Sequence, residues 1–294
     1  MAEMRLVRTN DATATARITC AAISVIVMAL SAGASRAVAA GLYDPPDSTT
    51  PTTRSSLTPT RSPSLSAVPS SAKRCRVTGG PKFPTAPVPG RAWTARLVGV
   101  TGLRTRPVIV HKPFRYLRPY APLGGGDVNL LITGRACDSH DRAWLRVYVP
   151  QRPNGSQAWI LRDYAVISRN EYRVVIDQSD RTLTLYLRGR RIWRTQVAVG
   201  KVETPTPLGS FAIAEKIRTG DPTNFLGPLV MPLTAFSETL NEYAGGNGRV
   251  AIHGTSVPQF IGTRASHGCI RLRNKDVTRL GRLLRSGTPV TIKR

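Results

Sequence analysis

Acidic side chains are scarce in this chain, whose 294 residues include 17 Asp and Glu against 42 Lys and Arg. The net charge of +25 favours polyanionic partners, such as nucleic acid, anionic lipid or an acidic wall polymer. Aromatic residues make up only 6% of the chain and do not cluster among the basic residues, and no zinc-finger spacing occurs. Nucleic-acid-binding domains usually carry such features, so we expect no nucleic-acid partner.

Cysteine is also scarce, with four in the chain, and neither a CxxC pair nor an HExxH motif is present. These absences remove the commonest sequence signatures of zinc sites. His253, His267 and Cys269 have the chemistry of zinc ligands, but no second cysteine or suitably spaced carboxylate completes a set. We therefore expect no metal and no cofactor.

The N-terminus has the features of a secretory signal. Three arginines precede an uncharged run from Ile18 to Ala34, and the small residues Ala37-Val38-Ala39 follow. This order predicts a signal peptide over residues 1–39, and hence export to an extracytoplasmic location in the cell envelope or wall. An uncleaved membrane anchor stays open as the alternative, because the 17-residue run is close to the shortest bilayer span.

Two regions of different composition follow. Residues 40–84 are rich in Ser, Thr and Pro with few large apolar residues, which predicts a disordered, solvated linker. Residues 85–168 contain short β-like runs separated by turn residues, which predicts a small β-barrel. The runs are Val108–Val110, Leu130–Ile132, Trp144–Val149 and Ala158–Ile160.

The stretch from Trp144 to Ile160, with its Arg152–Gly155 turn, resembles the end of a bacterial SH3-like module. Modules of this kind often accompany cell-wall enzymes, so the resemblance implies that the barrel positions the wall or the substrate. The alternative is a spacer domain in which Trp144 and Trp159 are ordinary core aromatics.

Residues 169–294 are expected to be mostly β, with one packed helix. The helix is predicted over Asn274–Leu284, with Asn274 as its N-cap, helical spacing of the apolar residues and Gly287 beyond its end. The strand-like runs are Tyr172–Asp177, Thr182–Leu187, Arg191–Val199, Val250–Ile252 and Pro289–Ile292.

A cysteine and a histidine near the C-terminus carry the strongest chemical signal. Cys269 directly follows Gly268, and His253 lies sixteen residues upstream, a spacing that suits the ends of two strands joined by a loop. Only a thiolate attacks a carbonyl well, and a neighbouring imidazole can take the thiol proton. Gly268 permits a tight turn, so that amide N–H groups near Cys269 can stabilise an oxyanion. The pattern predicts cysteine acyl transfer.

The stretches Ile252–Thr255 and Ser266–Leu272 together resemble the signature of L,D-transpeptidase (YkuD-type) catalytic domains of the bacterial cell wall. Val199–Lys201 and Thr204–Gly209 also resemble that family. The resemblance implies a mixed β fold and a cysteine enzyme acting on peptidoglycan stem peptides. Phe260 departs from the pattern, since the family more often has a small polar residue there, and we interpret it as a change in the cleft wall.

The resemblance also implies roles for individual residues. Cys269 is the expected nucleophile and His253 the expected base, while His267 and Gly268 support catalysis and His267 can exchange the base role with His253. Residues of the same motifs are expected to bind the substrate: Arg271, Ser266, Gly254 and Thr255. Thr204–Gly209 and the loop Lys216–Pro228 are expected to border the cleft, with the loop as a candidate lid and an ordinary connection as the alternative.

The function that the resemblance implies is an exported L,D-transpeptidase that crosslinks peptidoglycan stem peptides through a cysteine thioester. Its expected inhibitors are β-lactams, carbapenems among them, and anionic cell-wall polymers are expected as further partners. Two alternatives stay open. Water as the acceptor would give an L,D-carboxypeptidase, and a site without turnover would leave a non-catalytic wall-binding protein.

The remaining cysteines can then be counted. Without the signal segment the chain keeps Cys75, Cys137 and Cys269, an odd number for an oxidising compartment. Because Cys269 must be free to act, counting alone predicts a disulfide between Cys75 and Cys137.

Overall fold

The computed structural model describes Cys75 and residues 86–243 and 245–294. The predicted signal segment, and the predicted linker apart from Cys75, lie outside these residues. The described chain is mainly β, as predicted, with one α-helix among its strands. None of the helices in this part of the chain is long and apolar enough to cross a membrane.

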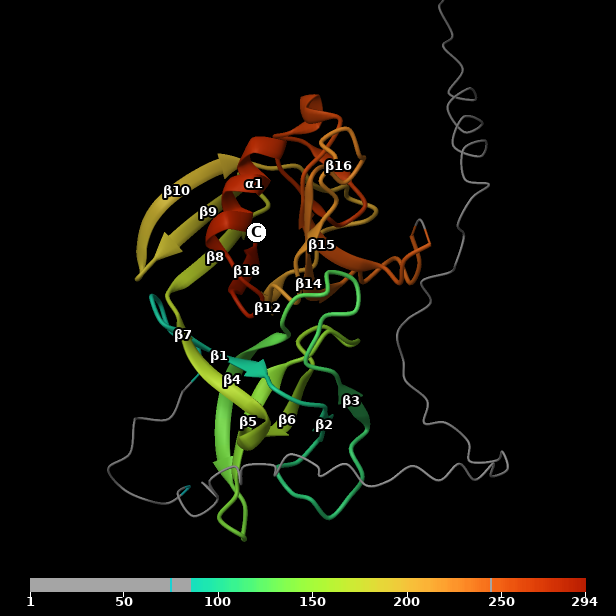
Figure 1. The fold of residues 1–294 in the computed structure, drawn as a ribbon. Helices are drawn as coiled ribbons and strands as arrows, with labels where there is room; N and C mark the ends of the chain where they lie inside the picture. Colours follow the sequence, from blue (N-terminus) through green and yellow to red (C-terminus); the bar gives the residue numbers. More distant parts are fainter. Residues whose placement is uncertain (1–74, 76–85, 244) are drawn as a thin grey trace, which may run out of the picture. The chain divides into compact units, whose positions relative to one another are not determined.

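The first folded part is a five-stranded antiparallel sheet with the order β6-β5-β4-β1-β7 (Figure 1). Trp144 is buried in it, with its indole N–H donating to Asp138 Oδ2 at 3.0 Å. Trp144 is thus a core aromatic, whereas the SH3-like assignment stays a prediction. The strands are β1 (Ala92–Leu97), β4 (Asn129–Cys137), β5 (Ala143–Tyr148), β6 (Gln157–Leu161) and β7 (Ala165–Asn170), with β2 (Thr101–Leu103) and β3 (Arg115–Leu117) forming a separate pair.

The predicted strand at Val108–Val110 is wrong, because this segment has no strand partner and Val110 is 84% exposed. Pro107 lacks an amide donor and Pro113 follows closely, so the segment cannot complete a ladder. A run of β-branched residues therefore forms an exposed connection between β2 and β3. The other predicted runs of this part all lie within or overlap observed strands.

The disulfide between Cys75 and Cys137 is confirmed, with 5.9 Å between the two Cα atoms, and Cys269 is free. It fastens the chain before β1 to the end of β4.

Reducing this disulfide should destabilise the first folded part. Because the bond closes a loop of 62 residues, Cys75→Ser should lower the free energy of unfolding by about 2 to 4 kcal/mol. Urea denaturation with and without reductant measures the loss, and in reductant the variant should match the wild type. Thiol titration of the unfolded, unreduced full chain should find only Cys20 and Cys269; four free thiols would contradict the account.

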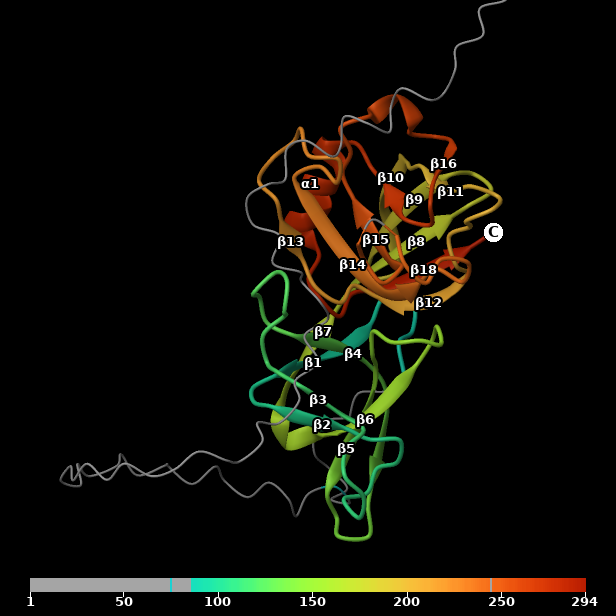
Figure 2. The ribbon, with the colours of Figure 1, turned by 90° about the vertical axis from the view of Figure 1, so that its right-hand side faces the viewer.

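The C-terminal part contains two larger sheets, ordered β10-β9-β8-β18-β12 and β13-β14-β15-β17, and a short pair, β11-β16 (Figures 1 and 2). The first sheet comprises β8 (Tyr172–Asp177), β9 (Thr182–Leu187), β10 (Arg190–Gln196), β12 (Gly209–Ala212) and β18 (Pro289–Lys293). The second comprises β13 (Ile217–Arg218), β14 (Leu229–Phe236), β15 (Arg249–His253) and β17 (Ile270–Arg271), and the short pair comprises β11 (Val199–Gly200) and β16 (Arg264–Ser266). The chain passes from the first part to this one at Glu171, between β7 and β8.

The predicted helix is confirmed as α1 (Asn274–Leu283), and it contacts strands of both larger sheets. Val277 and Leu280 are buried in the core that the sheets share. Towards β14, Gly281 lies so close to Leu229 that a Cβ would come within 2.2 Å of its Cδ2 atom. Towards β10, Thr195 Oγ1 donates to Asp276 Oδ2 at 2.9 Å. The helix therefore ties the two sheets together.

The sequence patterns did not predict β14, although all eight of its residues are buried. Its sequence has no polar alternation, and Pro232 argues against a central strand. The structure accommodates Pro232 beside a register shift in the pairing with β15, where the ladder is irregular. This buried strand supports β15, which carries His253.

Candidate active site

The parallel pairing of β15 and β17 brings the predicted catalytic residues together. His253 is opposite Arg271 in the register, and Cys269 directly precedes β17. Side chains two residues apart on a strand share a face, and paired residues project to the same face. His253, Cys269 and Arg271 therefore lie on one face of this pair.

His253 is held as a neutral base. Its side chain is 1% exposed, and Nδ1 lies 2.6 Å from the Gly254 carbonyl oxygen. A carbonyl can only accept, so Nδ1 carries the proton and Nε2 is the unprotonated, basic nitrogen of the neutral ring. Burial lowers the His253 pKa to about 4, opposed by the carbonyls of Gly254 and Leu226 and aided by the Arg271 charge.

The buried imidazole should make stability depend on acid pH. Because the pKa is about 4 in the folded state and near 6.5 when unfolded, the unfolded state binds the proton first as pH falls. The contribution of the neutral imidazole to the free energy of unfolding should be fully present above about pH 6.5. The free energy of unfolding should then fall by roughly 3 kcal/mol as the pH drops to 4. Urea melts across this range measure the slope.

His253→Gln is the matched variant for this test and should remove most of the slope. A smaller slope of the same sign should remain, because burial also lowers the His267 pKa. Asp138 does not interfere with this measurement. Its pKa is lowered from 3.8 to about 2, so the stability that its carboxylate contributes is lost only below about pH 3.8. An unchanged slope in His253→Gln would show that His253 is not buried neutral.

Cys269 is a free, partly exposed thiol. Burial raises its pKa, and a backbone hydrogen bond with Ala251 and the Arg271 charge oppose that rise. At neutral pH the resting site thus holds a neutral thiol and a neutral imidazole, not an ion pair. Proton transfer must then accompany attack on a substrate, a step in which a base with an unprotonated Nε2 is effective.

Ser266 fixes the turn that carries Cys269. Its buried hydroxyl donates to the Cys269 carbonyl at 2.5 Å and accepts from the Gly268 amide at 3.2 Å. Gly268 has φ of +110°, a conformation that favours glycine. These bonds direct Ser266 to the backbone of the turn, where its hydroxyl shapes the nucleophile's position.

The upstream motif braces the same turn. The Lys201 amide and the Thr204 hydroxyl both donate to the Ser266 carbonyl, at 2.9 and 3.4 Å. The Gly200 amide donates to Thr206 Oγ1 at 2.9 Å, and a Cβ at Gly200 would come within 2.4 Å of Thr204 O. Thr204–Gly209, expected to border the cleft, is therefore in direct contact with the turn before Cys269.

Arg271 is a buried cation, 7% exposed. Its guanidinium lies 4.8 Å from the Phe225 ring centroid, and its Nε atom has no hydrogen-bond partner among the described residues. No carboxylate in the described part of the chain forms an ion pair with it. A buried positive charge without a counter-ion favours an anionic ligand.

Asn274 connects the site to the loop that follows β13, a contact that the sequence did not predict. Its Oδ1 accepts from the Thr255 amide at 2.8 Å, and its Nδ2 donates to the Pro222 carbonyl at 2.9 Å. Arg273, not Asn274, is the N-cap of α1, so that prediction is wrong. A Cβ at Gly254 would come within 2.4 Å of Asn274 Oδ1, so Gly254 and Thr255 are tightly packed.

His267 is covered by an aromatic ring from a distant loop. The Tyr243 ring stacks on it with 4.5 Å between centroids and 26° between planes. Burial lowers the His267 pKa, and the charges of Lys201 and Arg271 add to this; its buried Nδ1 has no partner among the described residues. No sequence signal distinguishes Tyr243 from the other seven tyrosines.

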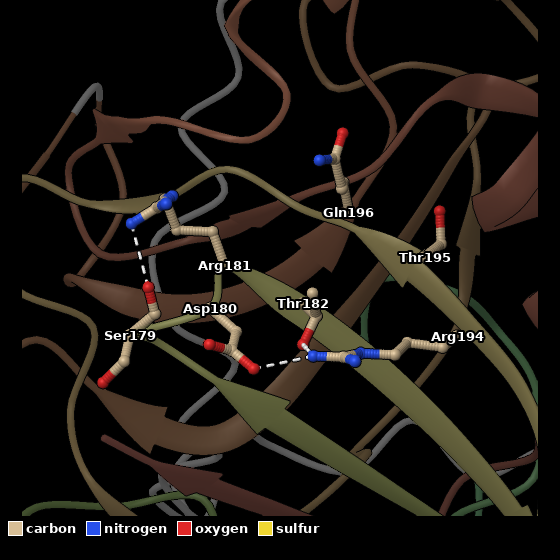
Figure 3. A pocket seen from close by; sticks show the side chains of 7 residues that line it. All are labelled: Ser179, Asp180, Arg181, Thr182, Arg194, Thr195 and Gln196. Carbon is tan, nitrogen blue, oxygen red and sulfur yellow. Dashed lines mark hydrogen bonds and ion pairs between the residues drawn. The ribbon is translucent and has the colours of Figure 1, made fainter.

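An open pocket at the β8–β9 turn contains none of the predicted site residues (Figure 3). Within it Arg194 donates to Asp180 Oδ2 at 2.7 Å and to Thr182 Oγ1 at 3.2 Å. Its polar groups largely satisfy one another, and we assign it no chemistry.

A zinc site at His253, His267 and Cys269 would need the donor atoms of all three side chains to lie close together. Among the described residues, the one group of three close ligand atoms is Cys75, Cys137 and Asp141, and its two sulfurs form the disulfide. The donor atoms at the candidate active site are not gathered in that way.

Comparisons with known proteins locate the similarity in the C-terminal part. A family model described as the L,D-transpeptidase catalytic domain, YkuD, matches residues 171–292. A Bacillus licheniformis protein named as L,D-transpeptidase YkuD is 37% identical over 121 residues, which are 41% of this chain and 65% of that protein. A Bacillus subtilis protein named as L,D-transpeptidase YqjB is 30% identical over 130 residues, which are 40% of this chain and 69% of that protein.

A solved structure of an Enterococcus faecium L,D-transpeptidase mutant is 24% identical in sequence, with a TM-score of 0.32. The matched region covers 42% of this chain and 49% of the Enterococcus faecium chain. The chain spans slightly less than two thirds of the length of the Bacillus licheniformis relative.

Proposed function

The chain belongs to the L,D-transpeptidase family, and from this premise we propose that it is an exported enzyme that crosslinks peptidoglycan stem peptides through a cysteine thioester. The observation that carries the proposal is the shared face of β15 and β17, where a neutral imidazole protonated on Nδ1 accompanies a free thiol. Export rests on the sequence of residues 1–39.

In the first step His253 Nε2 takes the Cys269 proton as sulfur attacks the carbonyl that precedes the terminal D-alanine of a donor stem. The C–N bond then breaks, the proton passes to the departing amine, and D-alanine leaves with a thioester on Cys269. In the second step the side-chain amine of an acceptor stem attacks the thioester. The amine loses a proton to His253, and the thiol is regenerated.

The oxyanion of each step needs a backbone donor near Cys269. The Gly268 amide already donates to Ser266 Oγ. We therefore assign the role of hydrogen-bond donor to the oxyanion to the Cys269 amide. Gly268 keeps the role of setting the turn through its positive φ. A fixed donor of this kind is commonly worth about 10²-fold or more in rate.

Arg271 is the proposed holder of the donor's terminal carboxylate. It lies on the same face as Cys269 and is a buried cation without an ion-pair partner among the described residues. A bidentate guanidinium suits a carboxylate. This assignment selects a donor that ends in a free acid, as a stem peptide does.

Two partner classes follow from this chemistry. A β-lactam presents a strained carbonyl that Cys269 can attack, so that the sulfur becomes acylated. One solved neighbour from Mycobacterium tuberculosis is described as a complex with a faropenem-derived adduct. Carbapenems are accordingly the proposed inhibitors. The net charge of +25 supports a further association with anionic wall polymers.

Product analysis separates transfer from hydrolysis. The full chain is incubated with a tetrapeptide donor, with and without an acceptor peptide bearing a free side-chain amine. A crosslinked dimer that appears only with acceptor supports the transpeptidase, and free tripeptide in both reactions supports the carboxypeptidase. Equal wall binding by wild type and Cys269→Ala, with no product, would leave the wall-binding alternative.

A further inference from the structure

Hydrogen bonds close the loop that carries Tyr243 at its neck, by which we mean residues 237–240 and 247–248. The Ser237 amide donates to the Gly248 carbonyl at 2.8 Å, and Ser237 Oγ accepts from the Leu240 amide at 3.0 Å. Gly248 has φ of +72°, and a Cβ there would come within 2.2 Å of Leu240 O. We call residues 237–248 the Tyr243 loop; only Ala244 in it lies outside the described residues.

Near the tip of the Tyr243 loop, Tyr243 forms a backbone bridge with Gly246. Tyr243 and Gly246 exchange both backbone hydrogen bonds, at 2.9 and 3.0 Å. The Tyr243 ring stacks on His267, two residues before Cys269. The position of this ring therefore depends on how the neck of the loop is held.

The neck is gripped by the β5–β6 turn of the first folded part. The Arg152 guanidinium donates to three carbonyls of the Tyr243 loop, those of Ser237 at 2.7 Å, Leu240 at 2.9 Å and Asn247 at 3.2 Å. These carbonyls come from both sides of the neck. One planar, multidentate donor thereby joins the two strands of chain that enter and leave the loop.

Asn154, from the same turn, holds the residue just before the loop. Its Nδ2 donates to the Phe236 carbonyl and its Oδ1 accepts from the Phe236 amide, both at 2.8 Å. The Arg152 guanidinium also lies 4.9 Å from the Phe236 ring centroid. Two neighbouring side chains of the first part thus satisfy backbone groups where β14 ends.

We propose that Arg152 and Asn154 are positioning residues for the acyl-transfer site, holding the Tyr243 loop so that Tyr243 covers His267. The kinetic part of this inference rests on the proposed function, whereas the structural part does not. It gives the first folded part a role in catalysis beyond that of a spacer or wall contact. We call Arg152 and Asn154 the clamp. Replacing either residue removes neither Lys201 nor Arg271, whose charges also lower the His267 pKa.

The test uses Arg152→Ala and Asn154→Ala in the full chain, with Arg106→Ala as the matched control. Arg106 is an exposed arginine of the same folded part. NMR follows the His267 ring, and crosslink formation is measured in parallel. We expect the His267 pKa to rise towards its ordinary value in both clamp variants and kcat to fall about threefold to tenfold, because small misplacements near a reacting group are costly. Arg106→Ala should change neither.

A double-mutant cycle with Tyr243→Ala separates positioning from general destabilisation. If the clamp acts through Tyr243, Arg152→Ala should cause no further loss of kcat once Tyr243 is gone. Full additivity of the two losses, or an unchanged His267 titration in both clamp variants, would overturn the inference. If the wild type forms no crosslink at all, the proposed function fails, and the His267 titration alone still decides whether the clamp holds Tyr243.

Discussion

Cys269→Ala will lower the rate of crosslink formation by about 10⁴-fold or more, because the variant has no nucleophile to form the thioester. The turn is held by Ser266 and Gly268, and the thiol adds one hydrogen bond, with the Ala251 backbone. The fold and donor binding should therefore persist. Initial rates of dimer formation, followed by chromatography, measure the loss.

Thermal melting provides the control for Cys269→Ala, and its midpoint should match that of the wild type within a few degrees. Cys269→Ser should be nearly as inactive, since a hydroxyl is a far weaker nucleophile without strong activation. If either variant kept a tenth of the wild-type rate, the thioester mechanism would be wrong.

His253→Gln will lower the rate at neutral pH by about 10²- to 10⁴-fold, the usual contribution of a general base. The reason lies in the raised pKa of Cys269: without the base, only the small fraction of thiol ionised by solvent can react. The rate of the variant should then increase about tenfold for each pH unit. In the wild type the rate of thioester formation should be nearly independent of pH above pH 5, because the His253 pKa is about 4.

His111→Gln is the matched control for His253→Gln, since His111 is exposed and lies in the first folded part. Its rate and pH profile should equal those of the wild type. A His253→Gln enzyme with the flat profile of the wild type would show that another group, with His267 the nearest candidate in the sequence motif, takes the proton.

Local patterns predicted β8, β9, β10, β15, β18 and α1 in the C-terminal part, but not β12, β13, β14, β16 or β17. The alternation in β8 and β9 gave their bounds, since Leu183 and Leu185 are buried while their neighbours are partly exposed. The helical spacing gave α1 to within one residue. The motif spacing placed His253 and Cys269 at the ends of two strands, and their parallel pairing agrees with it.

Contacts between distant segments could not be predicted in this way. Tyr243 stacks on His267, and Arg152 binds the neck of the Tyr243 loop. These residues are far apart in the sequence, and local hydrophobic periodicity carries no information on such contacts. Asn274 looked like a helix cap because Asn commonly fills that role, yet its side chain binds Thr255 and Pro222. The strand β14 was not predicted because Pro232 argues against a central strand, whereas in the structure Pro232 lies beside a register shift.

The most direct test of the thioester mechanism is intact-protein mass spectrometry of the full chain after incubation with a tetrapeptide donor and, separately, with a carbapenem. The account predicts one covalent adduct per chain with each reagent, and none in Cys269→Ala. The donor adduct should weigh as much as the tetrapeptide less D-alanine. No adduct with either reagent, or adducts that persist in Cys269→Ala, would contradict a thioester at Cys269.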